Sequence, residues 1–230
     1  MSRTIAIVED EAAIRENYAD ALRRQGFKVA LFANRREAEA AFERQLPDLA
    51  LLDIGLEEEV DGGFELCRRL RAMSPALPII FLTARDSDLD TISGLRLGAD
   101  DYLTKDISLP NLCARIQAFF RRIDNMPGDN GETVLHRGPL RLDMDRFAVY
   151  WRDTKVDLTL TEFWIVNSLA RRPGHVKSRE QLMQDAKIVV DDATITSHVK
   201  RVRGKFQEVD AGFDAIDTVY GMGYRWVEDT

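Results

Sequence analysis

The chain has few cysteines and no long apolar segment. Two of its 230 residues are cysteine, Cys67 and Cys113, so a framework of disulfide bonds is excluded and a reducing compartment is expected. Its apolar runs are short, as at Leu49–Leu52 and Ile79–Leu82, against the roughly 18 residues of a membrane-spanning helix. The first residues lead directly into Thr4–Val8, which is too short for the apolar core of a signal peptide. We therefore expect a cytoplasmic protein with no membrane segment.

The chain also lacks a strong excess of either charge. It carries 32 Lys and Arg against 39 Asp and Glu, a net charge of −7, with 45% hydrophobic and 31% charged residues. This mixture is typical of folded globular domains and excludes a disordered chain. Residues 124–230 hold 15 basic against 18 acidic residues, a net of −3. A nucleic-acid site in that half must therefore be a local feature.

Short apolar runs alternate with amphipathic stretches over residues 4–122. Five runs predict strands, and four of the stretches between and after them predict helices. The strands are Thr4–Val8, Phe27–Phe32, Leu49–Leu52, Pro78–Thr83 and Asp101–Thr104; the helices are Ala13–Gln25, Arg35–Gln45, Phe64–Met73 and Leu109–Arg122. Such alternation favours an α/β fold in which helices cover both faces of a parallel sheet, with right-handed crossovers.

The pattern changes after a polar stretch rich in turn-forming residues at 124–132. We predict a first domain over residues 1–123, a linker over 124–133 and a smaller α+β domain over 134–230. Capping-box spacing marks two helix starts in the second domain, at Thr159 with Glu162 and at Ser178 with Gln181. Short antiparallel strands and a closing hairpin are predicted at Leu140–Asp143, Phe147–Trp151, Lys155–Leu158 and Thr218–Val227.

Polar residues follow the predicted parallel strands at their carboxyl ends, where an open sheet binds ligands. Glu9 and Asp10 follow the first strand and Asp53 the third, Thr83 ends the fourth, and Lys105 follows the fifth. Packed carboxylates repel one another unless a cation lies among them, and oxygen ligands suit Mg²⁺. A neutralised carboxylate can act as a nucleophile and form an aspartyl-phosphate, while an ammonium and a hydroxyl stabilise the transferred phosphoryl group. Any one of these residues alone would be interpreted as a surface, capping or core residue, so the prediction depends on the set.

A helix predicted over Asp192–Phe206 combines an apolar stripe with a basic side. The stripe consists of Ile195, Val199, Val202 and Phe206. The predicted opposite side carries Thr194, Thr196, Ser197, Lys200, Arg201 and Arg203. Hydroxyls and cations in this arrangement can contact bases and phosphates when a helix lies in a major groove about 12 Å wide. His198 lies beside the stripe, where packing is the first interpretation and a phosphate contact the second.

Four segments in the first half resemble the receiver domains of two-component response regulators, which are flavodoxin-like. These segments are Ile7–Glu11, Asp53–Leu56, Phe81–Arg85 and Gly98–Lys105. The resemblance implies that Asp53 accepts a phosphoryl group from a sensor histidine kinase, with Lys105 and Thr83 beside it. It implies that Mg²⁺ is held by Glu9, Asp10, Asp53 and the carbonyl of Gly55. It also implies that Thr83 and Tyr102 form a switch pair that reports phosphorylation.

The same resemblance implies that the phosphorylated protein is a homodimer. The expected interface residues are Ile92, Leu95, Asp101, Ala114 and Arg115, with Asp101 and Arg115 paired across the twofold axis. Thr91 and Asn111 stand where the family usually has a basic–acidic pair. An exposed ion pair contributes about 0–1 kcal/mol, so we expect dimerisation to survive that loss.

Two departures from the receiver pattern lie beside the predicted site. Asp106 follows Lys105 where the family usually has proline, so we expect a trans peptide bond, a differently directed Lys105 and a weaker grip on phosphate. The loop after Asp53 has one residue more than usual and contains Glu57, Glu58 and Glu59. This composition predicts a solvated acidic loop that either disfavours an anionic phosphodonor or attracts a cation.

The second half resembles the winged-helix effector domain of the OmpR/PhoB class, from about Val134 to Val227. The matching segments are Thr159–Phe163, Ser178–Leu182, Thr194–Arg203 and Gly221–Arg225. The resemblance implies promoter DNA as a partner, with RNA polymerase as a further one. The DNA contacts would come from the basic side defined above, from His198 and from Tyr220 in the wing. Tyr220 stands where many members have arginine, so we expect fewer phosphate contacts and a weaker dependence of DNA binding on salt.

The leading hypothesis is a response regulator without enzymatic turnover, and three alternatives stay open. The first is a DNA-binding regulator whose atypical receiver works without phosphorylation. The second is an Asp53-dependent phosphohydrolase, although no second acid is placed to protonate a leaving group. The third is a protein-interaction adaptor whose second half does not bind DNA.

Overall fold

The computed structural model describes residues 2–56, 59–84, 97–124, 133–186 and 192–228. The chain divides into two compact units, Met1–Gln117 and Ala118–Thr230. The predicted domain limits at residues 123 and 133 stay a prediction. Within the described residues, no helix is long and apolar enough to cross a membrane.

The first unit is built on a five-stranded parallel sheet, which confirms the predicted fold class. The strands are β1 (Thr4–Val8), β2 (Lys28–Phe32), β3 (Leu49–Leu52), β4 (Ile79–Thr83) and β5 (Asp101–Thr104), in the order β2-β1-β3-β4-β5. Val8 lies level with Leu52, the last residue of β3. The carboxyl ends of β1 and β3 therefore meet at one edge of the sheet.

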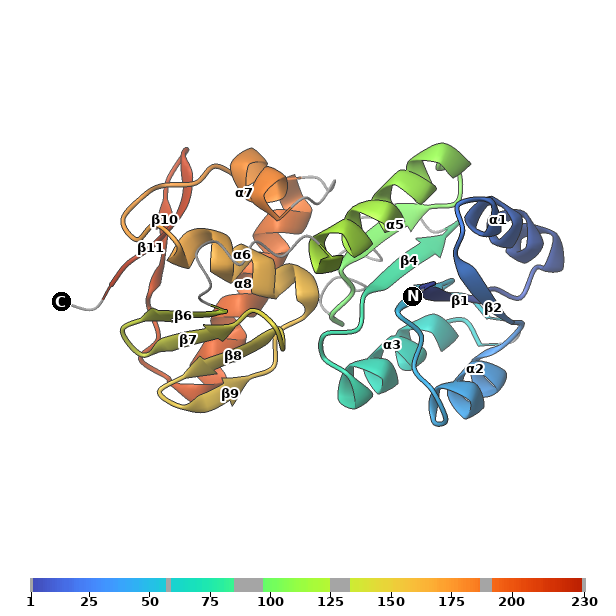
Figure 1. Ribbon diagram of the computed structural model, residues 1–230, viewed down its shortest axis with the longest axis horizontal. Helices are drawn as coiled ribbons and strands as arrows, with labels where there is room; N and C mark the ends of the chain where they lie inside the picture. Colours follow the sequence, from blue (N-terminus) through green and yellow to red (C-terminus); the bar gives the residue numbers. More distant parts are fainter. Residues whose placement is uncertain (1, 57–58, 85–96, 125–132, 187–191, 229–230) are drawn as a thin grey trace. The chain divides into compact units, whose positions relative to one another are not determined.

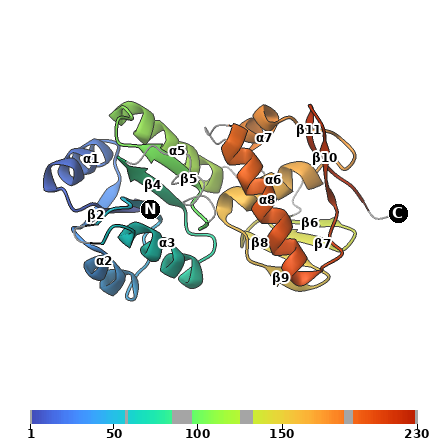
Figure 2. The ribbon, with the colours of Figure 1, turned by 180° about the vertical axis from the view of Figure 1, so that it is seen from behind.

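Helices cover both faces of this sheet (Figures 1 and 2). They are α1 (Ala12–Arg24), α2 (Arg35–Phe42), α3 (Gly62–Met73) and α5 (Leu109–Asp124). The helices α1 and α5 lie on one face, and α2 and α3 lie side by side on the other. All residues of β3 and β4 are buried, because a strand covered on both faces has no polar side. The observed limits differ from the predicted ones by up to three residues, at the end of α2.

After α5, the described residues of the second unit form a four-stranded antiparallel sheet, three helices and a C-terminal hairpin (Figure 1). Its elements are β6 (Val134–Arg137), β7 (Leu140–Asp143), β8 (Ala148–Trp151), β9 (Thr154–Val156), α6 (Leu160–Ala170), α7 (Arg179–Asp185), α8 (Asp192–Val209), β10 (Ile216–Val219) and β11 (Gly223–Trp226). Strand β6 is absent from the sequence prediction. It is a short edge strand that pairs with β7, and its half-exposed residues show no apolar run.

Local capping and aromatic packing explain why the second unit folds in this way. Both predicted capping boxes are present, at Thr159 with Glu162 and at Ser178 with Gln181. The indole of Trp151 on β8 packs edge-on against Phe206 of α8, with ring centroids 5.6 Å apart. This contact packs α8 against the antiparallel sheet through two aromatic side chains of the core.

Candidate functional site

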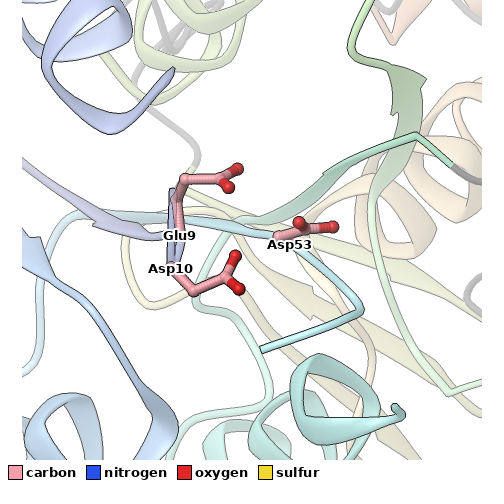
Figure 3. Close-up of side chains that lie close together, drawn as sticks. All are labelled: Glu9, Asp10 and Asp53. Carbon is pink, nitrogen blue, oxygen red and sulfur yellow. The ribbon is translucent and has the colours of Figure 1, made fainter. Parts of the chain in front are cut away.

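Three carboxylates meet where β1 and β3 end. Glu9 and Asp10 follow β1 and Asp53 follows β3, and one oxygen from each lies within 4.8 Å of the others. Figure 3 shows the three side chains projecting to the same side of the strand ends. Glu9 and Asp53 are 2% and 7% exposed, whereas Asp10 is exposed. The convergence predicted from the strand ends is therefore present in the structure.

The ammonium group of Lys105 lies between two of these carboxylates. Its Nζ is 2.7 Å from Oδ2 of Asp53 and 2.8 Å from Oε2 of Glu9. The peptide bond between Lys105 and Asp106 is trans, as expected, but the expectation that Lys105 is directed elsewhere is wrong. The exposed Asp106 carboxylate instead accepts a hydrogen bond from the hydroxyl of Thr104.

Burial and charge shift the protonation of this cluster. Burial, reinforced by the charge of Asp53, raises the pKa of Glu9 to about 7, although its hydrogen bond from Lys105 opposes the shift. Burial alone would lower the pKa of Lys105, but its hydrogen bonds to Asp53 and Glu9 outweigh this and raise it. The site thus holds more negative charge than one ammonium compensates, which is an environment that favours a bound cation.

The donor set fits Mg²⁺, which prefers oxygen ligands and retains several waters. Glu9, Asp10 and Asp53 supply carboxylate oxygens, and the exposed position of Asp10 leaves one side open to water. The other oxygen of Asp53, Oδ1, accepts a hydrogen bond from the backbone N–H of Ile54 at 2.7 Å. Gly55 is half-buried and follows Asp53 by two residues. Its role as a carbonyl ligand stays a prediction.

The predicted switch residues lie on neighbouring strands. Thr83 ends β4 and is 2% exposed, and Tyr102 on β5 is half-buried. Tyr102 pairs in register with Phe81, and the centroids of their rings are 6.2 Å apart. Thr83 therefore lies at the same sheet edge as the acidic cluster, with Tyr102 one strand farther along.

The predicted dimer residues are only partly described. Ile92 and Leu95 lie outside the described residues. Ala114 is exposed on α5, while Arg115 Nη1 lies 2.9 Å from Asp101 Oδ2 of the same chain. The Asp101–Arg115 pair thus forms within one chain in this structure, and its formation across a twofold axis stays a prediction.

The apolar stripe predicted on α8 is buried as expected, whereas part of the basic side is not exposed. Thr196 and Lys200 are exposed and Ser197 is half-buried. Thr194 and His198 are buried, with 5% and no exposed surface respectively. The prediction that Thr194 shares the basic side with Lys200 is therefore wrong, because the neighbouring elements of the unit cover a wider part of α8 than the stripe. The burial of His198 agrees with packing, its first interpretation.

Arg201 is also directed inward, toward a buried carboxylate. Its Nε is 2.8 Å from Oε1 of Glu162, and Lys205 Nζ is 2.7 Å from Oε2 of the same residue. A second nitrogen of Arg201, Nη2, lies 2.6 Å from Nδ1 of His198. Burial alone would raise the pKa of Glu162, but the charges of Arg201 and Lys205 lower it to about 2. The predicted solvent-facing position of Arg201 is therefore wrong, because its charge compensates a capping-box carboxylate.

The remaining predicted DNA residues lie around α8 and the hairpin. Arg203 donates to the carbonyl of Ile216 at 2.8 Å and to the hydroxyl of Thr218 at 2.7 Å, which ties α8 to β10. Tyr220 is 93% exposed at the turn of the hairpin. Contacts between DNA and any of these residues stay a prediction.

The sequence did not predict that one further cation, Arg179, lies next to Thr196. Arg179, in the first turn of α7, donates from Nε to the hydroxyl of Thr196 at 3.2 Å. Its guanidinium carbon is 5.7 Å from the centroid of the Tyr224 ring. No local pattern places Arg179 next to Thr196, because the two residues come from different helices.

Two family models match this chain. The response regulator receiver domain matches residues 5–117, and the C-terminal domain of transcriptional regulatory proteins matches residues 153–226. The transcriptional regulatory protein CreB of Escherichia coli strain K12 is 37% identical over 225 residues, which cover 96% of each chain. The sensory transduction protein RegX3 of Mycolicibacterium smegmatis is 40% identical over 226 residues, covering 96% of this chain and 98% of RegX3.

Solved structures show the same fold. A mutant of RitR superimposes with a TM-score of 0.79 over 99% of this chain and 100% of that chain. Its sequence identity of 23% supports a likeness of fold alone. With both domain models in order along one chain, and relatives that match over nearly their full length, this protein belongs to the OmpR/PhoB class of two-component response regulators, which control transcription.

Proposed function

We propose that Asp53 accepts a phosphoryl group from a phosphorylated histidine of a sensor histidine kinase. The observation that carries this proposal is the buried Asp53 carboxylate in contact with the Lys105 ammonium, 2.7 Å away, and grouped with Glu9 and Asp10. Asp53 is poised as a nucleophile because neighbouring charges and the Ile54 N–H hold its carboxylate in place.

In the transfer, a carboxylate oxygen of Asp53 forms a bond to phosphorus while the bond from phosphorus to the donor imidazole breaks. The imidazole nitrogen keeps the bonding electron pair and takes up a proton. Lys105 and Thr83 then contact the phosphoryl oxygens and compensate their charge. The chemistry proposed for this chain consists of this phosphorylation of its own Asp53 and the later hydrolysis of the phosphoaspartate.

We propose that Glu9, Asp10, Asp53 and the carbonyl of Gly55 hold Mg²⁺. When bound, this ion would supply positive charge that neutralises the carboxylates and the incoming phosphate. Lys105 also contacts Glu9 and Asp53, at 2.8 and 2.7 Å. Phosphate entry would require Lys105 to exchange a carboxylate contact for a phosphoryl oxygen.

We further propose that phosphorylation acts on DNA binding through dimerisation. Thr83 and Tyr102 would respond to the phosphoryl group and alter the face that contains Asp101, Ala114 and Arg115. Two linked effector domains then bind paired half-sites with multiplied affinity. Promoter DNA, RNA polymerase and the kinase are the proposed partners, and the cytoplasm is the proposed compartment.

The test is intact mass after incubation with acetyl phosphate and Mg²⁺. We expect one added phosphoryl group on the wild type and on Asp20→Ala, a matched change at an exposed acid of α1. We expect no addition on Asp53→Ala or without the metal. An unlabelled wild type would instead support a regulator that works without phosphorylation, and repeated release of phosphate from a small ester would support a phosphohydrolase.

A further inference from the structure

Backbone hydrogen bonds join two described residues of the loop that leaves the phosphoacceptor site, Leu56 and Glu59. Leu56 and Glu59 exchange two backbone hydrogen bonds, from Leu56 N–H to the Glu59 carbonyl at 3.1 Å and from Glu59 N–H to the Leu56 carbonyl at 2.9 Å. The N–H of Gly62 also donates to the Glu59 carbonyl at 3.1 Å. Leu56 is buried and belongs to the core cluster under α2 and α3. Glu59 is thus a defined member of the loop, not a freely solvated acid.

The side chain of Glu59 is bound by a cation from another element. Arg35, the first residue of α2, places Nε 2.6 Å from Oε2 and Nη2 3.2 Å from Oε1 of Glu59. This is a two-point contact, the geometry in which a guanidinium fixes the direction of a carboxylate. The hydrogen bond from Arg35 lowers the pKa of Glu59, so the pair stays charged at neutral pH.

Further ion pairs link Arg35 on α2 to α3, and the two helices lie side by side in Figure 1. Arg35 Nη1 is 3.0 Å from Oε1 of Glu39, and the other oxygen of Glu39 is 3.0 Å from Nη1 of Arg69 on α3. Glu39 is only 13% exposed on its side chain. The loop between β3 and α3 is therefore tied to both helices that cover this face of the sheet.

We propose that the Arg35–Glu59 pair positions the loop after Asp53 so that the Gly55 carbonyl is held in place for the cation; this inference rests on the proposed function. Gly55 lies between Asp53 and Leu56, and the N–H of Gly63 closes the loop on the carbonyl of Ile54 at 2.8 Å. The loop is anchored on one side by the buried Leu56 and on the other by Arg35. Loss of Arg35 removes this anchor, together with the two hydrogen bonds that fix the direction of the Glu59 carboxylate.

The experiment compares Mg²⁺ affinity and loop protection in full-length variants. Titration calorimetry with Mg²⁺ alone is applied to the wild type, Arg35→Gln, Glu59→Gln and the exchanged pair Arg35→Glu/Glu59→Arg. Arg23→Gln is the matched control, because Arg23 forms ion pairs with Glu16 and Asp20 within α1 at 3.3 and 3.2 Å. Hydrogen exchange of the amides of residues 54–63 is measured without metal.

We expect Arg35→Gln and Glu59→Gln to bind Mg²⁺ about tenfold more weakly, a loss typical of removing a group that orients a ligand. Exchange of the loop amides becomes faster in both variants, while strand amides keep their protection. The exchanged pair recovers only part of the affinity, because the new carboxylate at position 35 would face Glu39, and Arg23→Gln behaves as the wild type.

Two different failures can be told apart. If the wild type binds Mg²⁺ and is labelled on Asp53 but Arg35→Gln has the same affinity and exchange, the pair is an ordinary surface contact and the inference is overturned. If the wild type neither binds Mg²⁺ nor is labelled, the proposed function fails, and the positioning role fails with it.

Discussion

Gly63 lies directly against the main chain of the phosphoacceptor residue. A Cβ atom added at Gly63 would lie 1.9 Å from the carbonyl oxygen of Asp53, so the start of α3 or the end of β3 must shift. We expect Gly63→Ala to destabilise the first unit by about 1–3 kcal/mol, the usual cost of overpacking. We also expect slower labelling of Asp53, because its carboxylate moves relative to Lys105.

The neighbouring glycine provides a graded comparison. At Gly62 the nearest atoms are Cβ and Oε2 of Glu59 and Cβ of Leu56, at 3.0–3.2 Å, so a shift of a few tenths of an ångström relieves the contact. We therefore expect Gly63→Ala to lower the stability measured by scanning calorimetry, and the rate of Asp53 labelling, more than Gly62→Ala does. If Gly63→Ala had the stability and labelling rate of the wild type, the close approach of Gly63 to the Asp53 carbonyl would be contradicted.

One buried carboxylate of α6 is ion-paired with two cations of α8. Glu162 has no exposed surface and is held by Arg201 and Lys205. Because its pKa in the folded state is about 2, below the ordinary value of 4.5 for glutamate, its ionised form stabilises the fold above pH 4.5. That stabilisation is lost as the pH falls from about 4.5 towards 2. We expect acid unfolding of the second unit in this range.

Replacing this carboxylate tests the same contact at neutral pH. Glu162→Gln leaves Arg201 and Lys205 without their charge partner, and we expect a loss of roughly 3–5 kcal/mol. Tryptophan fluorescence reports the second unit selectively, because all three tryptophans, Trp151, Trp164 and Trp226, lie in it. Glu180→Gln, at an exposed acid of α7, serves as control. Unchanged stability of Glu162→Gln at pH 7 would show that the network contributes little.

At the scale of the whole molecule, the proposed activation predicts a phosphorylation-dependent dimer. Arg115 contacts Asp101 within the chain at 2.9 Å, so a charge reversal there repels Asp101 in either chain. With a phosphate mimic on Asp53, we expect Arg115→Glu to dimerise at least about tenfold more weakly than the wild type in sedimentation experiments. Arg68→Glu, at an exposed site on α3, should dimerise normally. Normal dimerisation of Arg115→Glu would place the interface elsewhere.

Much of the first unit was predictable from local pattern. Fully apolar runs mark β3 and β4 because both faces of these strands are covered, and polar residues mark the points where the strands end. Parallel pairing then brings Glu9, Asp10 and Asp53 to one edge without further information. Lys105 was placed correctly at that edge, but its direction follows from contacts with Glu9 and Asp53 that no spacing encodes.

In the second unit the limit of prediction lies in long-range charge pairing. The stripe of α8 follows from helical periodicity alone, and it is buried. The inward direction of Arg201 depends on Glu162, which lies 39 residues earlier on α6, and the hold of Arg35 on Glu59 spans 24 residues. Periodicity assigns a residue to a side of its own element, whereas the partner of a charged side chain is set by which elements pack together.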